Sequence, residues 1–209
     1  IIEAQEQLGG ILRYVISRDR LPGDVLDHDI QGVLDMGVEA RCGKRLGEDY
    51  SLNSLMTEGF DLVAFCSGGY DSRKLLPRGA SPVESVPGVQ LMIDLLAGGA
   101  EAVANRVGKR VVIIDGLSKA LEVAEQCLAA GAVEVCIASR ESFVMWPEEL
   151  RDAEALAARS IHVHAEHVAV ALGGRGDRLT TLVLEDVCPD EGELPGRLFH
   201  DVDTLILGA

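Results

Sequence analysis

Residues 108–139, GKRVVIIDGLSKALEVAEQCLAAGAVEVCIAS, decide the fold. They contain an apolar strand, a tight corner, a helix from about residue 117 to residue 130, a stop at Gly131 and a second apolar strand. The helix carries one apolar stripe, formed by Leu117, Leu121, Ala124 and Leu128. Such a stripe packs on a sheet, and the spacing suits a right-handed crossover between parallel strands. The stretch therefore predicts an α/β fold.

The residues before and after this stretch show different sequence patterns. Residues 1–105 mix short apolar runs with Gly and Pro, which predicts strands and functional loops; FDLVAFCSGG, from residue 60, is expected to be a buried strand. A second helix is expected to open near Pro147. Residues 161–187 alternate with period two and predict an antiparallel hairpin with two strands. The closing strand, VDTLILGA, follows no helix, and we expect it to return to the first domain.

The acidic composition limits the possible partners. Nineteen Lys and Arg against 34 Asp and Glu give a net charge of -15, which disfavours nucleic acid and anionic membranes. No apolar run reaches the roughly 18 residues of a membrane span, and no basic leader is evident. The five cysteines lack metal, cluster or C-x-x-C spacing. We expect a soluble cytoplasmic protein with reduced thiols, and its strand-like ends indicate a piece of a longer chain.

The corner after the first strand has the outline of a nucleotide-binding turn with altered residues. A G-x-G-x-x-G/A fingerprint would place its first two glycines at Asp115 and Leu117, while Gly116 and Ala120 fit the spacer and third positions. At 4 to 5 Å and an effective dielectric near 20, a carboxylate and a phosphate repel by about 3 to 4 kcal/mol, on the order of a hundredfold in affinity. Asp115 is expected to cap its own helix instead. The sequence thus favours a degenerate site over a working one.

Other reactive side chains carry weaker signals. His162 and His164 share one face of a predicted strand and His167 lies on the other, so without a further ligand at metal spacing we expect no metal site. Cys127 and Cys136 fall in apolar patterns typical of buried packing. No side chain stands out as a catalytic acid, base or nucleophile.

The motifs of the chain, taken in order and spacing, resemble the small (beta) subunit of glutamate synthase. The resemblance runs from Glu3 to the closing LILGA and includes the specific motifs Gly9-Gly10, Leu12-Arg13, Arg20-Leu21-Pro22, Cys66-Ser67-Gly68 and Ser72-Arg73-Lys74-Leu75. It implies two Rossmann-like dinucleotide-binding domains, with the NAD(P)-type domain inserted into the FAD-type domain. The corresponding segments are residues 1–105, a partial FAD-binding domain, residues 106–200, the inserted domain, and residues 201–209, a strand returning to the FAD domain.

The resemblance also implies cofactor-binding residues in the first segment. Glu3 would accept hydrogen bonds from the adenosine ribose of FAD. The flavin and pyrophosphate would be lined by Gly9, Gly10, Leu12 and Arg13. Ser67 and Gly68 would pass beside FAD in a strand-end turn, where the family commonly has Ala-Thr-Gly.

In the inserted segment, the candidate NAD(P)H contacts are Gly116 and Ser118 at the turn and Arg140 and Glu141 after the next strand. The family often carries an arginine-rich stretch there for the 2'-phosphate of NADPH, and this chain keeps only Arg140 of it. Glu141 favours a free ribose diol, and hence NADH over NADPH.

The activity implied by the resemblance is that of an oxidoreductase subunit, in which electrons pass between NAD(P)H, FAD and a larger redox subunit or iron-sulfur partner. Two alternatives stay open. The chain could be a non-catalytic docking module of a redox complex that uses its acidic face, or an active NADH oxidoreductase with a rebuilt phosphate turn.

Overall fold

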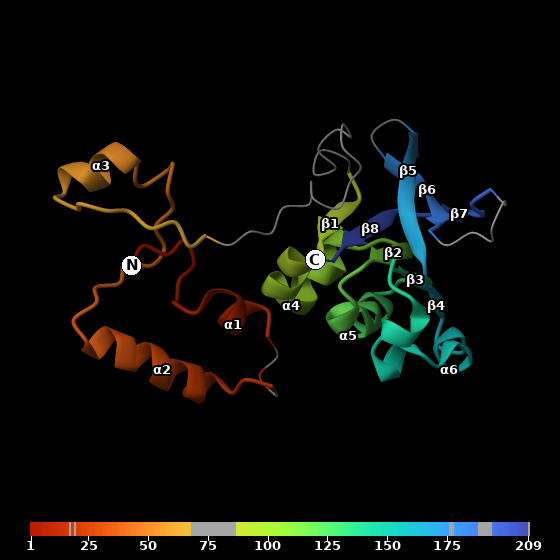
Figure 1. Ribbon diagram of the computed structural model, residues 1–209, viewed down its shortest axis with the longest axis horizontal. Helices are drawn as coiled ribbons and strands as arrows, with labels where there is room; N and C mark the ends of the chain where they lie inside the picture. The colour runs from red at the N-terminus through yellow and green to blue at the C-terminus, as the bar shows by residue number, and fades with distance from the viewer. Residues whose placement is uncertain (17, 19, 68–86, 176–177, 188–193, 209) are drawn as a thin grey trace. The chain divides into compact units, whose positions relative to one another are not determined.

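The structure, a computed structural model, describes residues 1–16, 18, 20–67, 87–175, 178–187 and 194–208. The chain divides into two units, Ile1–Gly69 and Tyr70–Ala209 (Figure 1). The Ser72-Arg73-Lys74-Leu75 motif and Gly68 lie outside the described residues. Within these described ranges, no helix is both long and apolar enough to cross a membrane.

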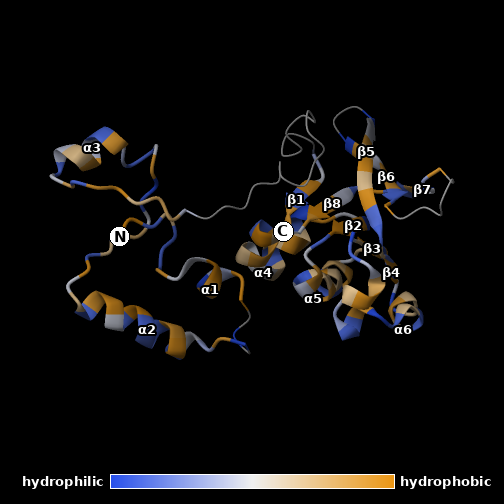
Figure 2. Cartoon of the chain, in the orientation of Figure 1, coloured by the Kyte–Doolittle hydropathy of each residue, from blue (hydrophilic) through white to orange (hydrophobic). Residues whose placement is uncertain are grey.

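The first unit is built from short helices and loops. Its helices are α1 (Gly10–Tyr14), α2 (Gly23–Asp35) and α3 (Leu52–Thr57). Hydrophobic and hydrophilic bands alternate along α2 in Figure 2, as expected of a helix with one apolar face. The described part of this unit pairs its extended segments only through isolated bridges, such as Ile2 with Arg41. The expected buried strand at residues 60–67 is wrong: Leu62 is 79% exposed and Phe65 61%, and no strand among the described residues pairs with this segment.

The second unit has a five-stranded parallel sheet with the order β1-β8-β2-β3-β4. Its strands are β1 (Val89–Leu91), β2 (Arg110–Ile114), β3 (Glu134–Ala138), β4 (Ile161–His164) and β8 (Thr204–Leu207). A three-stranded antiparallel sheet follows, with β5 (His167–Arg175), β6 (Arg178–Asp186) and β7 (Arg197–Asp201). The helices are α4 (Met92–Arg106), α5 (Leu117–Ala129) and α6 (Ala153–Ala157). This mixed α/β architecture confirms the predicted fold class.

The parallel sheet lies between two apolar cores. Alternation along β2 sends Val111 and Ile113 to the core with α4 and α5, and Val112 and Ile114 to the core with the antiparallel sheet. Because both faces of the parallel strands are covered, they are continuously apolar, as β2 and β3 show in the sequence. The helices, the parallel sheet and the antiparallel sheet thus form three layers. Polar side chains gather at the ends of the parallel strands, outside these layers.

Several boundaries differ from the sequence-based expectations. The closing strand does not return to the first unit: β8 lies between β1 and β2 in the second unit's sheet and pairs with both. The boundary expected at residue 105 is also displaced, because β1 and α4 belong to this second unit. The first strand of the expected hairpin is two strands, β4 and β5, separated by a turn in which Glu166 has a φ of 57°. The helix expected at Pro147 is a 3-10 turn, Glu148–Leu150, followed by α6.

Candidate functional site

The carboxyl ends of the parallel strands bring three polar or small segments to one edge of the sheet. Asp115 and Gly116 follow β2, Ser139 follows β3, and Gly208 follows β8. In open α/β sheets, ligands bind in the crevice outside this edge, where the helix after the first strand begins. Residues 115–117 therefore form the turn against which the pyrophosphate of a nucleotide would bind.

The turn between β2 and α5 is built from two left-handed residues. Asp115 has a φ of 59° and Gly116 a φ of 66°. A Cβ at Gly116 would lie 2.8 Å from Met92 Cε and 2.9 Å from Gly208 Cα, and one at Gly208 would lie 2.5 Å from Gly116 N. The space freed by the missing side chains is thus occupied by the chain's own atoms. The Cα side of Gly116 is therefore closed to a ligand.

The carboxylate of Asp115 has a partner other than its own helix. Its Oδ1 accepts a hydrogen bond from Ser139 Oγ at 2.7 Å, and Ser139 is 1% exposed. Across the described residues, α5 has no side-chain hydrogen bond at its N-terminus, where Gly116 is the N-cap residue. The predicted self-cap by Asp115 is therefore wrong: the left-handed turn places the carboxylate across to the end of β3. The negative charge nevertheless remains at the edge where an anion would bind.

The other candidate nucleotide contacts lie at the same edge with exposed side chains. Ser118 is in the first turn of α5, and Arg140 and Glu141 follow β3. The backbone of Glu141 is well anchored: its N–H donates to Ser139 Oγ at 3.2 Å, and its carbonyl accepts from Trp146 Nε1 at 3.0 Å. The segment after β3 is therefore held in place while the Glu141 carboxylate stays free to face solvent.

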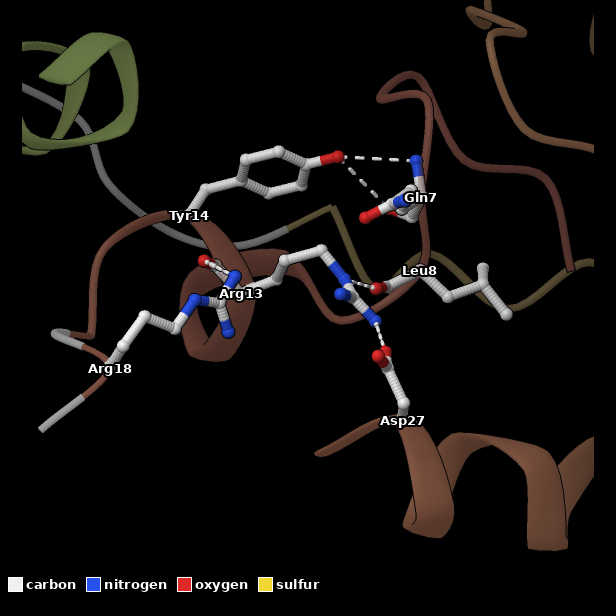
Figure 3. Close-up of polar contacts among 6 residues, drawn as sticks. All are labelled: Gln7, Leu8, Arg13, Tyr14, Arg18 and Asp27. Atoms are coloured by element: carbon white, nitrogen blue, oxygen red, sulfur yellow. Dashed lines mark hydrogen bonds and ion pairs between the residues drawn. The ribbon is translucent and has the colours of Figure 1, made fainter. Parts of the chain in front are cut away.

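The candidate FAD residues of the first unit give a mixed fit. Arg13 Nε donates to the carbonyl of Leu8 and its guanidinium pairs with Asp27 Oδ1, as Figure 3 shows. These two contacts occupy part of the guanidinium that the resemblance assigns to a phosphate. Gly10 fits better, because a Cβ there would meet nothing within 4 Å. Leu12 is half-exposed.

Two of the remaining residues of this set, Gly9 and Glu3, make contacts within the first unit. A Cβ at Gly9 would lie 3.1 Å from Arg13 Cβ and 3.2 Å from Leu26 Cδ2, so internal packing explains this glycine. The Glu3 carboxylate accepts the N–H of Gln5 at 2.8 Å. Ser67 is exposed.

Two residues of the carboxyl edge were missed from the sequence. Met92, at the start of α4, fills the space over Gly116, and nothing in the sequence signals this long-range contact. Gly208 has a detectable signal, since a glycine that ends a buried strand often marks a close approach of another backbone.

Comparison with curated proteins shows similarity to redox subunits, although no protein-family model matches the chain. The NADP(+)-dependent formate dehydrogenase subunit beta of Moorella thermoacetica is 31% identical over 160 residues, covering 74% of this chain and 22% of the relative. The NAD-dependent dihydropyrimidine dehydrogenase subunit PreT of Salmonella typhimurium is 28% identical over 175 residues, covering 83% and 41%. A putative glutamate synthase (NADPH) small chain of Cereibacter sphaeroides is 24% identical over 213 residues, covering 97% and 50%.

These matches confirm the resemblance to the glutamate synthase small subunit, and the chain spans half or less of the length of these three relatives. Among solved structures, histamine dehydrogenase from Rhizobium sp. 4-9 superposes with a TM-score of 0.62 at 22% identity, covering 100% of this chain and 31% of that one. This likeness shows a shared fold.

Proposed function

We propose that the chain is part of a flavoprotein electron-transfer subunit whose NAD(P)H site is degenerate. The first unit would belong to an FAD-type domain and the second to an inserted NAD(P)-type domain. The observation that carries the degenerate site is the Asp115 carboxylate at the carboxyl edge, held by Ser139 beside a turn that Met92 and Gly208 already fill. The names of the relatives, all subunits or chains of redox enzymes, support the electron-transfer role.

Two physical effects oppose a nicotinamide nucleotide at this edge. The charge of Asp115 repels a phosphate by about 3 to 4 kcal/mol at 4 to 5 Å in a half-buried setting. The contacts of Gly116 with Met92 and Gly208 remove the close backbone approach that a dinucleotide needs. A nucleotide that still binds would be NADH in preference to NADPH, because the carboxylate of Glu141 disfavours a 2'-phosphate.

FAD, when bound, would supply the redox chemistry, since flavin accepts electrons in pairs and releases them singly. The residues of this chain would position it: the open side of Gly10 admits close approach, and Leu12 offers an apolar surface. Arg13 would stay with Asp27 and shape the loop that precedes α1. A larger redox subunit or iron-sulfur protein would receive the electrons, in the cytoplasm.

One observation favours the alternative of a non-catalytic docking module. The apolar side chains of Phe60, Leu62 and Phe65 are exposed together along one short segment of the first unit. Exposed apolar clusters often mark protein contacts. In this alternative the segment would bind a neighbouring subunit, and no flavin would be present.

Two measurements on the native, full-length protein that carries this chain separate these functions. The first is its visible absorption spectrum: bound flavin in stoichiometric amount supports the flavoprotein, and a colourless preparation supports the docking module. The second is an anaerobic titration of that flavin. We expect dithionite to bleach it fully and millimolar NADH or NADPH to bleach it little. Complete bleaching by one equivalent of NADH would contradict the degenerate site and would favour the active oxidoreductase with a rebuilt phosphate turn.

A further inference from the structure

A thiol and two imidazoles meet in the second unit, between the parallel and the antiparallel sheet. Cys136 lies on β3, His164 on β4 and His200 on β7. One potential ligand atom from each residue lies within 4.8 Å of those of the other two. The rings of His164 and His200 are edge to face, with centroids 5.1 Å apart. The cluster is thus formed by the contact between the parallel and antiparallel sheets.

Strand geometry explains why these side chains converge. On β3, Val135 and Ile137 pack in the core with α5, so the intervening Cys136 points to the antiparallel sheet. On β4, Ile161 and Val163 pack on the helical side in the same way, which directs His164 to the side of Cys136. Pairing of β6 with β7 then brings His200 over the same layer.

One nitrogen atom of the cluster lacks a hydrogen-bond partner in the part of the chain that the structure describes. The Nε2 atom of His200 is buried and has no hydrogen-bond partner among the residues that the structure describes. A neutral imidazole nitrogen without a hydrogen atom is a free ligand for a metal ion.

A cavity of about 460 Å³ borders two of the three residues of the cluster. Its lining includes Cys136 and His200 together with two carboxylates, Glu134 and Asp201. Asp201 is paired with Arg110 at 3.1 Å, whereas Glu134 lies 3.5 Å from His162 Nε2. Since Arg110 and Glu134 begin β2 and β3, the cavity opens at the amino edge of the parallel sheet, opposite the edge that carries Asp115. Carboxylates at an entrance raise the local concentration of cations.

We propose that Cys136, His164 and His200 form a binding site for one divalent zinc-type cation, with a fourth coordination position open to the cavity. One thiolate and two imidazoles are the ligands that Zn²⁺ and its spectroscopic substitute Co²⁺ prefer. Metal bonds of about 2.0 to 2.3 Å in tetrahedral geometry separate the ligand atoms by roughly 3.3 to 3.8 Å. Small side-chain rotations are therefore sufficient to close the site from its present spacing.

Binding has a defined proton balance. Burial, with a smaller contribution from Glu134, raises the pKa of the Cys136 thiol to about 12, so the metal-free thiol is protonated at neutral pH. A coordinated thiol loses this proton outright. Each cation bound therefore releases one proton to the buffer, and the affinity rises with pH.

The test is a titration of the full chain with CoCl₂ after treatment with a chelator. We expect one equivalent to bind with the near-ultraviolet charge-transfer band of a cobalt-thiolate bond, and ZnCl₂ to displace it. Cys136→Ser should abolish the band, and His200→Ala should weaken affinity at least tenfold. The matched controls, Cys42→Ser and the exposed His28→Ala on α2, should leave both unchanged.

His200→Ala keeps the test decisive if Cys136→Ser fails to fold, because β7 has a single neighbouring strand, β6, among the strands described, and it can lose a side chain with less damage to the core. Absence of a thiolate band in the wild-type chain would overturn the site. So would a band that survives in folded Cys136→Ser, or an affinity that His200→Ala leaves unchanged.

Discussion

Replacement of Asp115 by Asn isolates the charge at the carboxyl edge of the sheet. Asparagine keeps the size of the side chain, tolerates the φ of 59°, and retains an oxygen that can accept the hydrogen bond from Ser139. It removes only the negative charge, whose repulsion of a phosphate is about 3 to 4 kcal/mol at 4 to 5 Å and an effective dielectric near 20. This energy corresponds to on the order of a hundredfold in affinity. Because Met92 still fills the turn, we expect NADH binding to tighten by roughly ten- to a hundredfold.

Isothermal titration calorimetry with NADH at low salt measures this effect, with Asp24→Asn on α2 as a control of equal net charge. Urea denaturation should show Asp115→Asn to be as stable as the parent, whereas Asp115→Ala should lose about 1 to 3 kcal/mol through the unpaired Ser139 hydroxyl. The reasoning is refuted if Asp115→Asn and the parent bind NADH equally well. It is equally refuted if the parent chain already binds NADH with micromolar affinity.

Three further predictions concern the second unit, one of them by comparison with Cys66 of the first. Gly208→Ala should destabilise it by about 1 to 3 kcal/mol in urea denaturation, because the added methyl group meets backbone at 2.5 Å, while Gly196→Ala, with nothing within 4 Å, should be near neutral. Iodoacetamide at pH 8 should label exposed Cys66 but not Cys127, whose thiol pKa burial raises to about 12; labelled Cys127 in a peptide map would contradict this. Burial lowers the pKa of His164 from 6.5 to about 4, so on acidification the unfolded chain takes up this proton at a higher pH than the folded chain does. In the presence of a chelator, the free energy of unfolding should therefore fall as the pH drops from 6.5 toward 4. In thermal melts, His164→Gln should reduce the fall of Tm with pH over this range, and an unchanged dependence of Tm on pH would refute the prediction.

The parts of the fold that were predictable from the sequence depend on local patterns. The helix expected from about residue 117 to 130 is α5, and the strands on either side of it are β2 and β3, because apolar periodicity and the Gly131 stop act over a few residues. The break between β4 and β5 was missed because Glu166 takes a left-handed conformation without a glycine or proline to announce it. The place of β8 was also missed, since its pairing with β1 and β2 is set by long-range contacts rather than by a local pattern.

The candidate sites were likewise predictable where the signal is local in the sequence and not where it depends on long-range contacts. The altered fingerprint at residues 115–117 was readable, but the partner of Asp115 was not, because Ser139 reaches it only through the pairing of β2 with β3. The histidines of β4 suggested no metal site from the sequence. His200, which gives the cluster its third ligand, is far along the chain and is brought in by the register of β6 and β7.

The place of β8 inside the sheet, between β1 and β2, has a consequence for synthesis on the ribosome. Thr204–Leu207 lies between β1 and β2, so β1 has β8 as its sheet neighbour and β2 keeps one unpaired edge until these residues emerge. A nascent chain that pauses before residue 204 exposes backbone donors and acceptors on apolar strands, which is the condition for mispairing with another chain. Fragments or nonsense products that stop short of β8 should therefore be cleared or aggregate, even though almost all of the second unit has been made.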